Sequence, residues 1–154
     1  MDVKKSCSVT GHRQLKDNQI EFIRQELRCE IELAIKEGYT HFISGFANGA
    51  DIEYAAIVTE IKKDNPTITL EAALPYRKRM NTKNKQFREL LNKCDKITII
   101  SEEYDKDCFY KRNSYMIANS ERVIAVFDGR KKGGTFHAIK VAEKNNRKIR
   151  CINI

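Results

Sequence analysis

Glycine, hydroxyl-bearing and basic residues gather in four short segments, and each segment directly follows a predicted strand. The first is Thr10-Gly11-His12-Arg13, which combines a flexible turn with a titratable imidazole and a guanidinium suited to two hydrogen bonds with a phosphate. A tight turn with an exposed arginine explains the same residues, and a lone histidine is more often a hydrogen-bonded structural residue than a catalyst or a metal ligand. Gly11, His12 and Arg13 are candidate ligand-binding residues on this basis.

The second segment, residues 44–51, is the most suggestive of the four. It reads Ser-Gly-Phe-Ala-Asn-Gly-Ala-Asp and places two glycines four residues apart, so that the backbone can approach a ligand closely before a helix begins. Two roles fit Asp51: it caps the helix, or its carboxylate accepts hydrogen bonds from a ribose hydroxyl, as acidic residues do in dinucleotide sites. The candidate ligand-binding residues here are Ser44, Gly45, Ala47, Gly49 and Asp51.

The third segment, residues 128–135, has an order of residues that suits phosphate binding. Asp128-Gly129 leads through three basic residues to Gly133-Gly134-Thr135 and directly into a predicted helix. Glycine amides can point at an anion, the threonine supplies a hydroxyl, and the helix dipole adds roughly 0.3–1 kcal/mol per charge. The segment is not a Walker A loop, because no Gly-Lys-Ser/Thr sequence is present. A glycine turn with solvated lysines is the alternative, and the candidate ligand-binding residues are Asp128, Gly129, Gly133, Gly134 and Thr135.

The fourth segment, residues 101–113, ends in Lys111-Arg112-Asn113 at a predicted helix start. Arg112 can reach the same ligand and Asn113 can recognise a base or a ribose, although a surface helix explains these residues equally well. The three histidines have no cysteine or acidic partner at metal-ligand spacing. The sequence therefore predicts no metal site and no cofactor.

Short apolar runs alternate with longer helical patterns along the chain, which is typical of strand-helix units that build a parallel sheet. The predicted strands are Ser6–Thr10, His41–Ser44, Thr67–Leu74, Lys96–Ile100, Arg122–Phe127 and Lys148–Ile152. A first helix has apolar residues at three- and four-residue spacing from Ile20 to Ile35, with Asp17 as the candidate cap at its start and Gly38 at its end. Further helices are predicted at Ala50–Lys63, Thr82–Lys93, Tyr110–Ser120 and Thr135–Asn145.

These elements predict a single Rossmann-like α/β domain over residues 1–154, with a parallel sheet of about six strands and helices on both faces. Ligands of such folds bind outside the carboxyl ends of the strands, where helix N-termini offer free amides. The four polar segments should therefore meet at one edge of the sheet. The two prolines, Pro66 and Pro75, are expected before and after the third strand.

Composition narrows the class of protein further. The five cysteines are odd in number, scattered, and never spaced as Cys-x-x-Cys, which argues against a disulfide framework or a zinc ribbon and favours a reducing cytoplasm. No stretch approaches the roughly 20 apolar residues that span a bilayer, so no membrane association is expected. The net charge of +8 favours anionic partners, either a small phosphorylated ligand or a nucleic acid. The densest basic stretch, Arg77 to Arg88, is interpreted as a solvated helix start.

Taken together, the four segments resemble the YpsA-like branch of the SLOG superfamily, over nearly the whole chain. That superfamily also includes the DNA-processing protein DprA and the LOG phosphoribohydrolases, and the resemblance implies a Rossmann-like fold with a pocket for a nucleotide ligand. LOG enzymes carry a glutamate three residues after the threonine of their glycine-threonine loop, and the corresponding residue here is Ala138. Binding without catalysis is therefore favoured, although Asp51, Glu102 or Glu103 remain candidates for a substitute carboxylate.

Three functions are in competition. The favoured hypothesis is that the protein senses or sequesters a nucleotide-derived ligand, with ADP-ribose-related compounds among the candidates. The enzymatic alternative is a nucleotide N-glycosidase or phosphoribohydrolase with an unrecognised carboxylate. The third is DprA-like binding of single-stranded nucleic acid, which the net charge supports and the lack of an aromatic stacking series opposes. A homodimer is expected by analogy with related folds.

Overall fold

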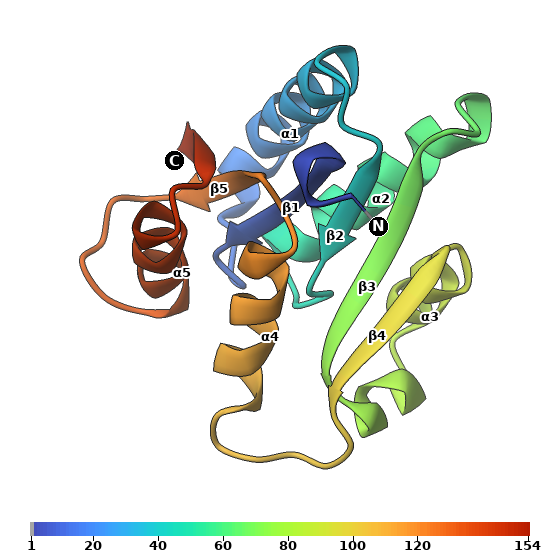
Figure 1. The fold of residues 1–154 in the computed structure, drawn as a ribbon, viewed down its shortest axis with the longest axis vertical. Coiled ribbons are helices and arrows are strands. Elements are labelled where there is room, and N and C mark those ends of the chain that lie inside the picture. The colour runs from blue at the N-terminus through green and yellow to red at the C-terminus, as the bar shows by residue number, and fades with distance from the viewer. Residues whose placement is uncertain (1) are drawn as a thin grey trace.

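Among residues 2–154, which the computed structural model describes, six strands form one parallel sheet (Figure 1). The strands are β1 (Ser6–Gly11), β2 (His41–Ser44), β3 (Thr69–Tyr76), β4 (Lys96–Ser101), β5 (Arg122–Phe127) and β6 (Lys148–Asn153). They lie in the order β4-β3-β2-β1-β5-β6, and every neighbouring pair is parallel. The strand order reverses between β1 and β5, so the fold has its topological switch point there, where ligands of such sheets bind.

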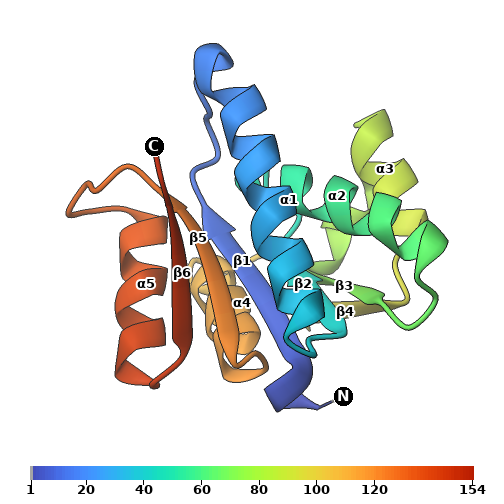
Figure 2. The ribbon, with the colours of Figure 1, turned by 90° about the horizontal axis from the view of Figure 1, so that it is seen from above.

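Helices cover both faces of the sheet (Figure 2). One face carries α1 (Ile20–Lys36), α2 (Ala50–Asp64) and α3 (Lys85–Asn92), and the other carries α4 (Cys108–Ala118) and α5 (Gly134–Lys144). Short 3-10 helices occupy Val3–Lys5, Asp17–Gln19 and Arg77–Asn81. The predicted Rossmann-like α/β class is confirmed. None of the described helices has the length and apolar character needed to cross a membrane.

The first helix illustrates how the apolar spacing builds the core. Ile23, Leu27, Ile31 and Ala34 recur on one side of α1 and are completely buried. Burying each of the larger side chains stabilises the fold by about 1.5–3 kcal/mol. Gly38 follows the helix with φ +99°, and its N–H bonds the carbonyl of Ile35 at 3.0 Å, as expected for a glycine that ends a helix.

The predicted start of α1 is wrong. Asp17 lies within the 3-10 helix that precedes α1, and its side chain does not cap the α-helix, which begins only at Ile20. The residue before α1 is Gln19, and its side chain makes no capping hydrogen bond. The extra 3-10 turn moves the start of α1 beyond the reach of Asp17.

The third strand begins and ends two residues later than the predicted Thr67–Leu74. It covers Thr69–Tyr76, so Pro75 lies inside the strand rather than after it. The neighbouring strand β2 ends where Ser44 pairs with Ala72, and beyond this point β3 has only β4 as a neighbour. A proline is tolerated there because one edge of the strand needs no ladder hydrogen bond.

The boundaries of the next two helices were displaced as well. Helix α3 begins at Lys85 rather than Thr82, because Asn84 caps it by accepting the N–H of Phe87 at 3.0 Å. Helix α4 begins two residues earlier than predicted, at Cys108, and ends at Ala118. The remaining helices agree with the sequence to within one residue at each end.

A buried carboxylate lies on the sheet face that α4 packs against. Glu71 of β3 is completely buried, and His41 of β2, Thr98 of β4 and Tyr115 of α4 surround it at 2.7, 2.7 and 2.6 Å. Burial raises the pKa of Glu71, but these hydrogen bonds lower it by more, so the net pKa lies below the ordinary value. The network ties three strands and a helix together through one ionised side chain.

Candidate functional site

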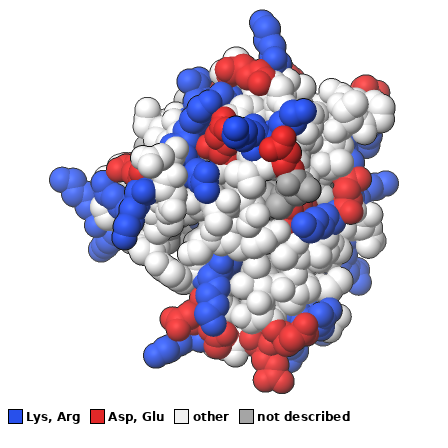
Figure 3. All heavy atoms as spheres, viewed as in Figure 1, with Lys and Arg blue, Asp and Glu red and all other residues white. Residues whose placement is uncertain are grey.

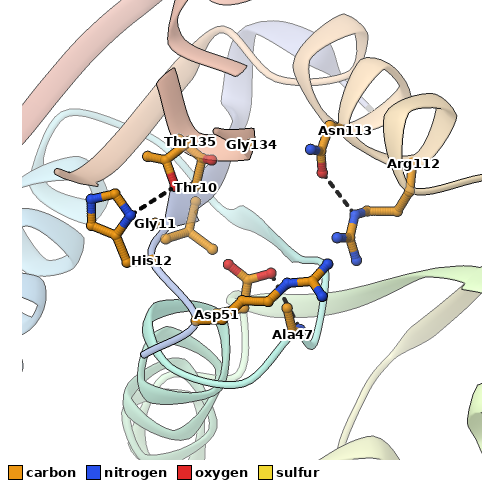
Figure 4. Close-up of a pocket in the computed structure, with 11 residues that line it drawn as sticks. Thr10, Gly11, His12, Ala47, Asp51, Arg112, Asn113, Gly134 and Thr135 are labelled. Atoms are coloured by element: carbon orange, nitrogen blue, oxygen red, sulfur yellow. Dashed lines mark hydrogen bonds between the residues drawn. The ribbon is translucent and has the colours of Figure 1, made fainter. Parts of the chain in front are cut away.

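The loops that follow β1, β2, β4 and β5 meet at the carboxyl edge of the sheet and enclose a pocket of about 170 Å³ (Figure 4). Nine of the candidate ligand-binding residues predicted from the sequence line it. These nine are Gly11, His12, Arg13, Ala47, Asp51, Arg112, Asn113, Gly134 and Thr135. Val9 and Thr10 of β1 also line the pocket and were not among the predicted ligand-binding residues, although Thr10 belongs to the first polar segment and Val9 directly precedes it.

Asp51 contributes the carboxylate of this pocket. It is 7% exposed, lies in the first turn of α2, and its Oδ2 accepts the N–H of Ala47 at 3.3 Å. Gly49, not Asp51, is the N-cap residue of α2, so helix capping in the usual sense is not its role. Burial raises the pKa of Asp51 to about 6, while the positive charges of Arg112 and Arg13 oppose the rise. Asp51 therefore changes its charge near neutral pH.

Arg112 brings a buried positive charge to the same pocket. It is 4% exposed, its Nη1 donates to the carbonyl of Gly45 at 2.6 Å, and its Nε donates to Oδ1 of Asn113 at 2.8 Å. Burial lowers its pKa and the charge of Asp51 opposes this. Among residues 2–154, no carboxylate oxygen lies within 4.0 Å of a guanidinium nitrogen of Arg112, so the side chain forms no ion pair. A buried charge without a contacting counter-ion is costly, and the carboxylate of Asp51 acts on this one only from beyond ion-pair distance.

The first turn of α5 closes the opposite side of the pocket. Gly133 precedes the helix with φ +93°, and Gly134 and Thr135 line the cavity. No side chain caps the N-terminus of α5 in the described part of the chain. The amides and the partial positive charge of this 11-residue helix are therefore available to an anionic group.

His12 connects the β1 loop with the β5 loop and α5. Its Nε2 accepts the backbone N–H of Asp128 at 3.2 Å, and its Nδ1 lies 3.5 Å from Oγ1 of Thr135 (Figure 4). Burial lowers the pKa of His12, although the carboxylate of Asp128 opposes this. The same Nε2 also lies 3.2 Å from Oδ1 of Asp128. His12 thus holds two loops in register while one edge lines the pocket.

Three of the predicted glycines allow protein segments to meet one another. A Cβ on Gly11 would lie 2.4 Å from the Cβ of Ala50, and a Cβ on Gly49 would lie 2.3 Å from the carbonyl oxygen of His12. Gly49 also has φ +83°, which favours glycine. A Cβ on Gly45 would lie 2.5 Å from Nη1 of Arg112. These glycines set the loop geometry by close contacts within the protein, and Gly45 and Gly49 do not line the pocket.

Four further predicted residues also lie outside the pocket lining. Ser44 is buried beneath it, where its hydroxyl donates to the carbonyl of Asp51 at 2.9 Å. Asp128 is engaged by Arg130, whose Nε lies 2.9 Å from Oδ2, and this hydrogen bonding holds the pKa of Asp128 far below its usual value. Gly129 and Gly133 have no neighbouring atom that a Cβ would meet, so both lie in open space.

The two other candidate carboxylates are not at the site. Glu102 forms an exposed ion pair with Arg77 at 2.6 Å, and Glu103 is exposed and does not line the pocket. Ala138 is buried in α5, in a small apolar cluster with Ile117 of α4 and Val123 of β5. Asp51 is therefore the only carboxylate among the described residues that line the pocket.

The family is established by comparison with known sequences. The family model named YpsA, described as the YspA SLOG family, matches residues 7–154. The chain belongs to this YpsA SLOG family. One relative, the uncharacterized SPbeta prophage-derived protein YoqJ of Bacillus subtilis, is 31% identical over 129 residues, which are 73% of this chain and 75% of YoqJ. A UPF0398 protein of Enterococcus faecalis is 25% identical over 156 residues, covering 93% of this chain and 87% of the relative.

The fold of this YpsA-family chain is also similar to that of a solved structure. DNA processing protein A from Helicobacter pylori, which was solved to examine how it binds single-stranded DNA, superimposes with a TM-score of 0.68 at 18% sequence identity. The match covers 97% of this chain and 65% of that one, so the chain spans less than two thirds of its structural neighbour. At this identity the likeness concerns the fold.

Proposed function

We propose that this YpsA-family protein binds a nucleotide-derived ligand in the pocket between β1, α2, α4 and α5, and that it senses or sequesters the ligand. The observation that carries the proposal is the buried guanidinium of Arg112, which faces the pocket without a contacting carboxylate. The uncapped N-terminus of α5 lines the same cavity. Two independent features thus favour anionic groups in this pocket, and phosphate groups suit both features.

Polar groups around this anion site suit the rest of a nucleotide. Thr135 offers a hydroxyl beside the helix amides, and Asn113 offers an amide whose oxygen already accepts a bond from Arg112. Asp51 offers a carboxylate that can accept hydrogen bonds from ribose hydroxyls. ADP-ribose and related compounds are among the ligands that combine these groups.

Cleavage of an N-glycosidic bond is the second candidate, and the pKa of Asp51 is the observation that favours it. A carboxyl group with a pKa of about 6 exists in both protonation states near neutral pH, as general acid-base catalysis requires. The LOG-type glutamate is replaced by Ala138, however, and only one carboxylate lines the pocket in the described part of the chain. Binding therefore remains the better-supported proposal.

Single-stranded nucleic acid is the other anionic partner to consider, because the structural neighbour was solved for its binding of single-stranded DNA. On the face drawn in Figure 3, basic and acidic side chains are interspersed around the rim, and no continuous basic stripe crosses the centre. An enclosed pocket with a buried arginine suits a small ligand better than a strand that must pass over the surface.

A thermal-shift screen with product analysis separates these functions. Purified protein is heated with adenine and guanine nucleotides, NAD, ADP-ribose, cyclic nucleotides and a short single-stranded oligonucleotide, and every stabilising compound is recovered and analysed by chromatography. A ligand recovered intact supports binding, and a released base supports the glycosidase. Stabilisation by the oligonucleotide alone, with a steep dependence on salt, contradicts the proposal.

Calorimetry on variants then tests the assigned site. Arg112→Ala should weaken binding of the stabilising nucleotide about tenfold or more, because a charge-assisted hydrogen bond contributes roughly 1.5–3 kcal/mol. Arg112→Lys keeps the charge but not the planar guanidinium, so its affinity should lie between those of the wild type and Arg112→Ala. Arg88→Ala is the matched control, since Arg88 is exposed on α3 and lies outside the pocket. Unchanged affinity in Arg112→Ala would remove Arg112 from the site.

A further inference from the structure

A second cavity, of about 110 Å³, adjoins the pocket on the side of β3. The two cavities share Arg13, Ala47 and Arg112 as lining residues, so one ligand can extend from the first into the second. The second cavity is also lined by Gly45, which the sequence predicted for the site, and by residues that it did not predict, among them Arg79 from the 3-10 helix after β3 and Phe109 from the start of α4. None of its lining side chains is acidic.

The arginines of this cavity differ from most others in the protein. Six arginines form ion pairs with carboxylates, namely Arg24, Arg28, Arg77, Arg122, Arg130 and Arg150. By contrast, the three arginines that line the cavity, Arg13, Arg79 and Arg112, form no ion pair. Among residues 2–154, no carboxylate oxygen lies within 4.0 Å of their guanidinium nitrogens. Their charges are therefore not neutralised by direct contact with the protein.

Aromatic rings hold these guanidiniums in place of carboxylates. The Cζ of Arg13 lies 4.9 Å from the centroid of the Phe109 ring, and the Cζ of Arg112 lies 5.8 Å from it. The Cζ of Arg79 lies 5.3 Å from the centroid of Phe87, on α3. A ring positions a guanidinium through its face and leaves the N–H groups at its edge free to donate. The rings themselves use none of the N–H groups, although Arg112 donates from Nη1 to Gly45 and from Nε to Asn113.

Bringing three positive charges together is unfavourable unless an anion joins them. Burial lowers the pKa of Arg112, and the charges of Arg13 and Arg79 lower it further, while Asp51 opposes both effects. A doubly charged phosphate group among the three arginines would remove this repulsion and accept several charge-assisted hydrogen bonds.

We infer that the second cavity is an anion subsite, and that the ligand carries two linked anionic groups, one at the N-terminus of α5 and one between Arg13, Arg79 and Arg112. The inference rests on the proposed function, which it narrows to nucleoside diphosphates and compounds that contain a diphosphate linkage. A nucleoside monophosphate fills only one of the two anion positions.

The test compares mono- and diphosphates on wild-type protein and on Arg79→Gln. The probes are the 5′-mono- and 5′-diphosphates of adenosine, guanosine, cytidine and uridine, titrated by calorimetry. Wild-type protein should bind the diphosphate of the preferred nucleoside at least tenfold more tightly than its monophosphate. Arg79→Gln should lose most of this preference and keep its affinity for the monophosphate, because Arg79 does not line the first pocket.

Two further variants control for net charge and folding. Arg88→Gln removes an exposed arginine from α3 that lies outside both cavities, and it should keep the wild-type preference. Arg79→Lys keeps the charge and should retain part of the preference, with a melting temperature close to that of the wild type. Equal affinity of the wild type for mono- and diphosphate, or an equal loss of both in Arg79→Gln, overturns the subsite and leaves the proposed function intact. Absence of binding for all of these probes and for every compound of the thermal-shift screen overturns both the subsite and the proposed function.

Discussion

The raised pKa of Asp51 implies that this carboxylate destabilises the unliganded protein at neutral pH. Its pKa moves from an ordinary value of 3.8 to about 6 on folding, mainly because the side chain is buried. A shift of about two pKa units corresponds to about 3 kcal/mol, at roughly 1.36 kcal/mol per unit. Asp51→Asn, which replaces the charge by a neutral group of the same shape, should therefore stabilise the free protein by up to about 3 kcal/mol above pH 7.

The sign of the pH dependence follows from the direction of the shift. Because the folded state binds the proton of Asp51 more tightly than the unfolded state, protonation stabilises the fold. This stabilisation is complete below pH 3.8 and is lost as the pH rises through 6. The difference in stability between Asp51→Asn and the wild type should consequently be large at pH 8 and shrink toward zero near pH 4.

Denaturant unfolding of both proteins between pH 4 and 8 measures this difference in free energy, and thermal unfolding measures it as a shift in melting temperature. At pH 8 the melting temperature of Asp51→Asn should exceed that of the wild type by roughly 6–12 °C, since 1 kcal/mol shifts a domain of this size by about 2–4 °C. Asp128→Asn is the control, because Asp128 is more exposed and Arg130 holds its pKa low, so no gain is expected. A variant that is less stable at pH 8, or a difference that does not vary with pH, would refute this account of Asp51.

Two other predictions concern the framework around the site. Gly11→Ala should destabilise the protein by about 1–3 kcal/mol in denaturant unfolding, because the new Cβ would lie 2.4 Å from that of Ala50. A Cβ on Gly134 meets no atom, so Gly134→Ala should be as stable as the wild type. Equal stability of the two variants would contradict the close packing of β1 against α2. Glu71→Gln should lose about 1–3 kcal/mol at pH 7 by weakening a buried hydrogen-bond network. Because the pKa of Glu71 is lowered on folding, its ionised side chain stabilises the fold above the ordinary pKa of 4.5, and this stabilisation is lost as the pH falls through the folded pKa. A loss of stability in Glu71→Gln that grew on acidification would be evidence against the network.

The sheet was predictable because the strands carry continuous β-branched or apolar runs. His41–Ser44 and Arg122–Phe127 were predicted with the bounds that the structure has. The alternation of these runs with helical patterns admits few arrangements besides a parallel sheet covered on both faces. Once that fold is given, the carboxyl edge where residues after the strands converge follows from topology alone.

The roles of individual residues depended on tertiary contacts that a sequence does not contain. The spacing of Gly45 and Gly49 suggested close approach to a ligand, and the structure adds that their close protein neighbours are Arg112 and the backbone of His12 while Gly45 also lines the second cavity. Arg79 was interpreted as part of a solvated helix start, because nothing in the basic stretch distinguishes it from its neighbours. Only the 3-10 helix after β3 and the ring of Phe87 separate it from the exposed basic residues and bring it to the cavity.

The most direct test of the central claim is to map the binding of a nucleoside diphosphate on the backbone amides by NMR. Titration with the diphosphate that binds most tightly in calorimetry should shift the amide signals of Gly134 and Thr135 most strongly. The amide signals of the loop around Ala47 should shift less, over the same range of ligand concentration. Signals of α3 residues away from the cavities should stay in place. Saturable binding that leaves the Gly134 and Thr135 amides unmoved and shifts a different surface would contradict the assignment of the pocket as the nucleotide site.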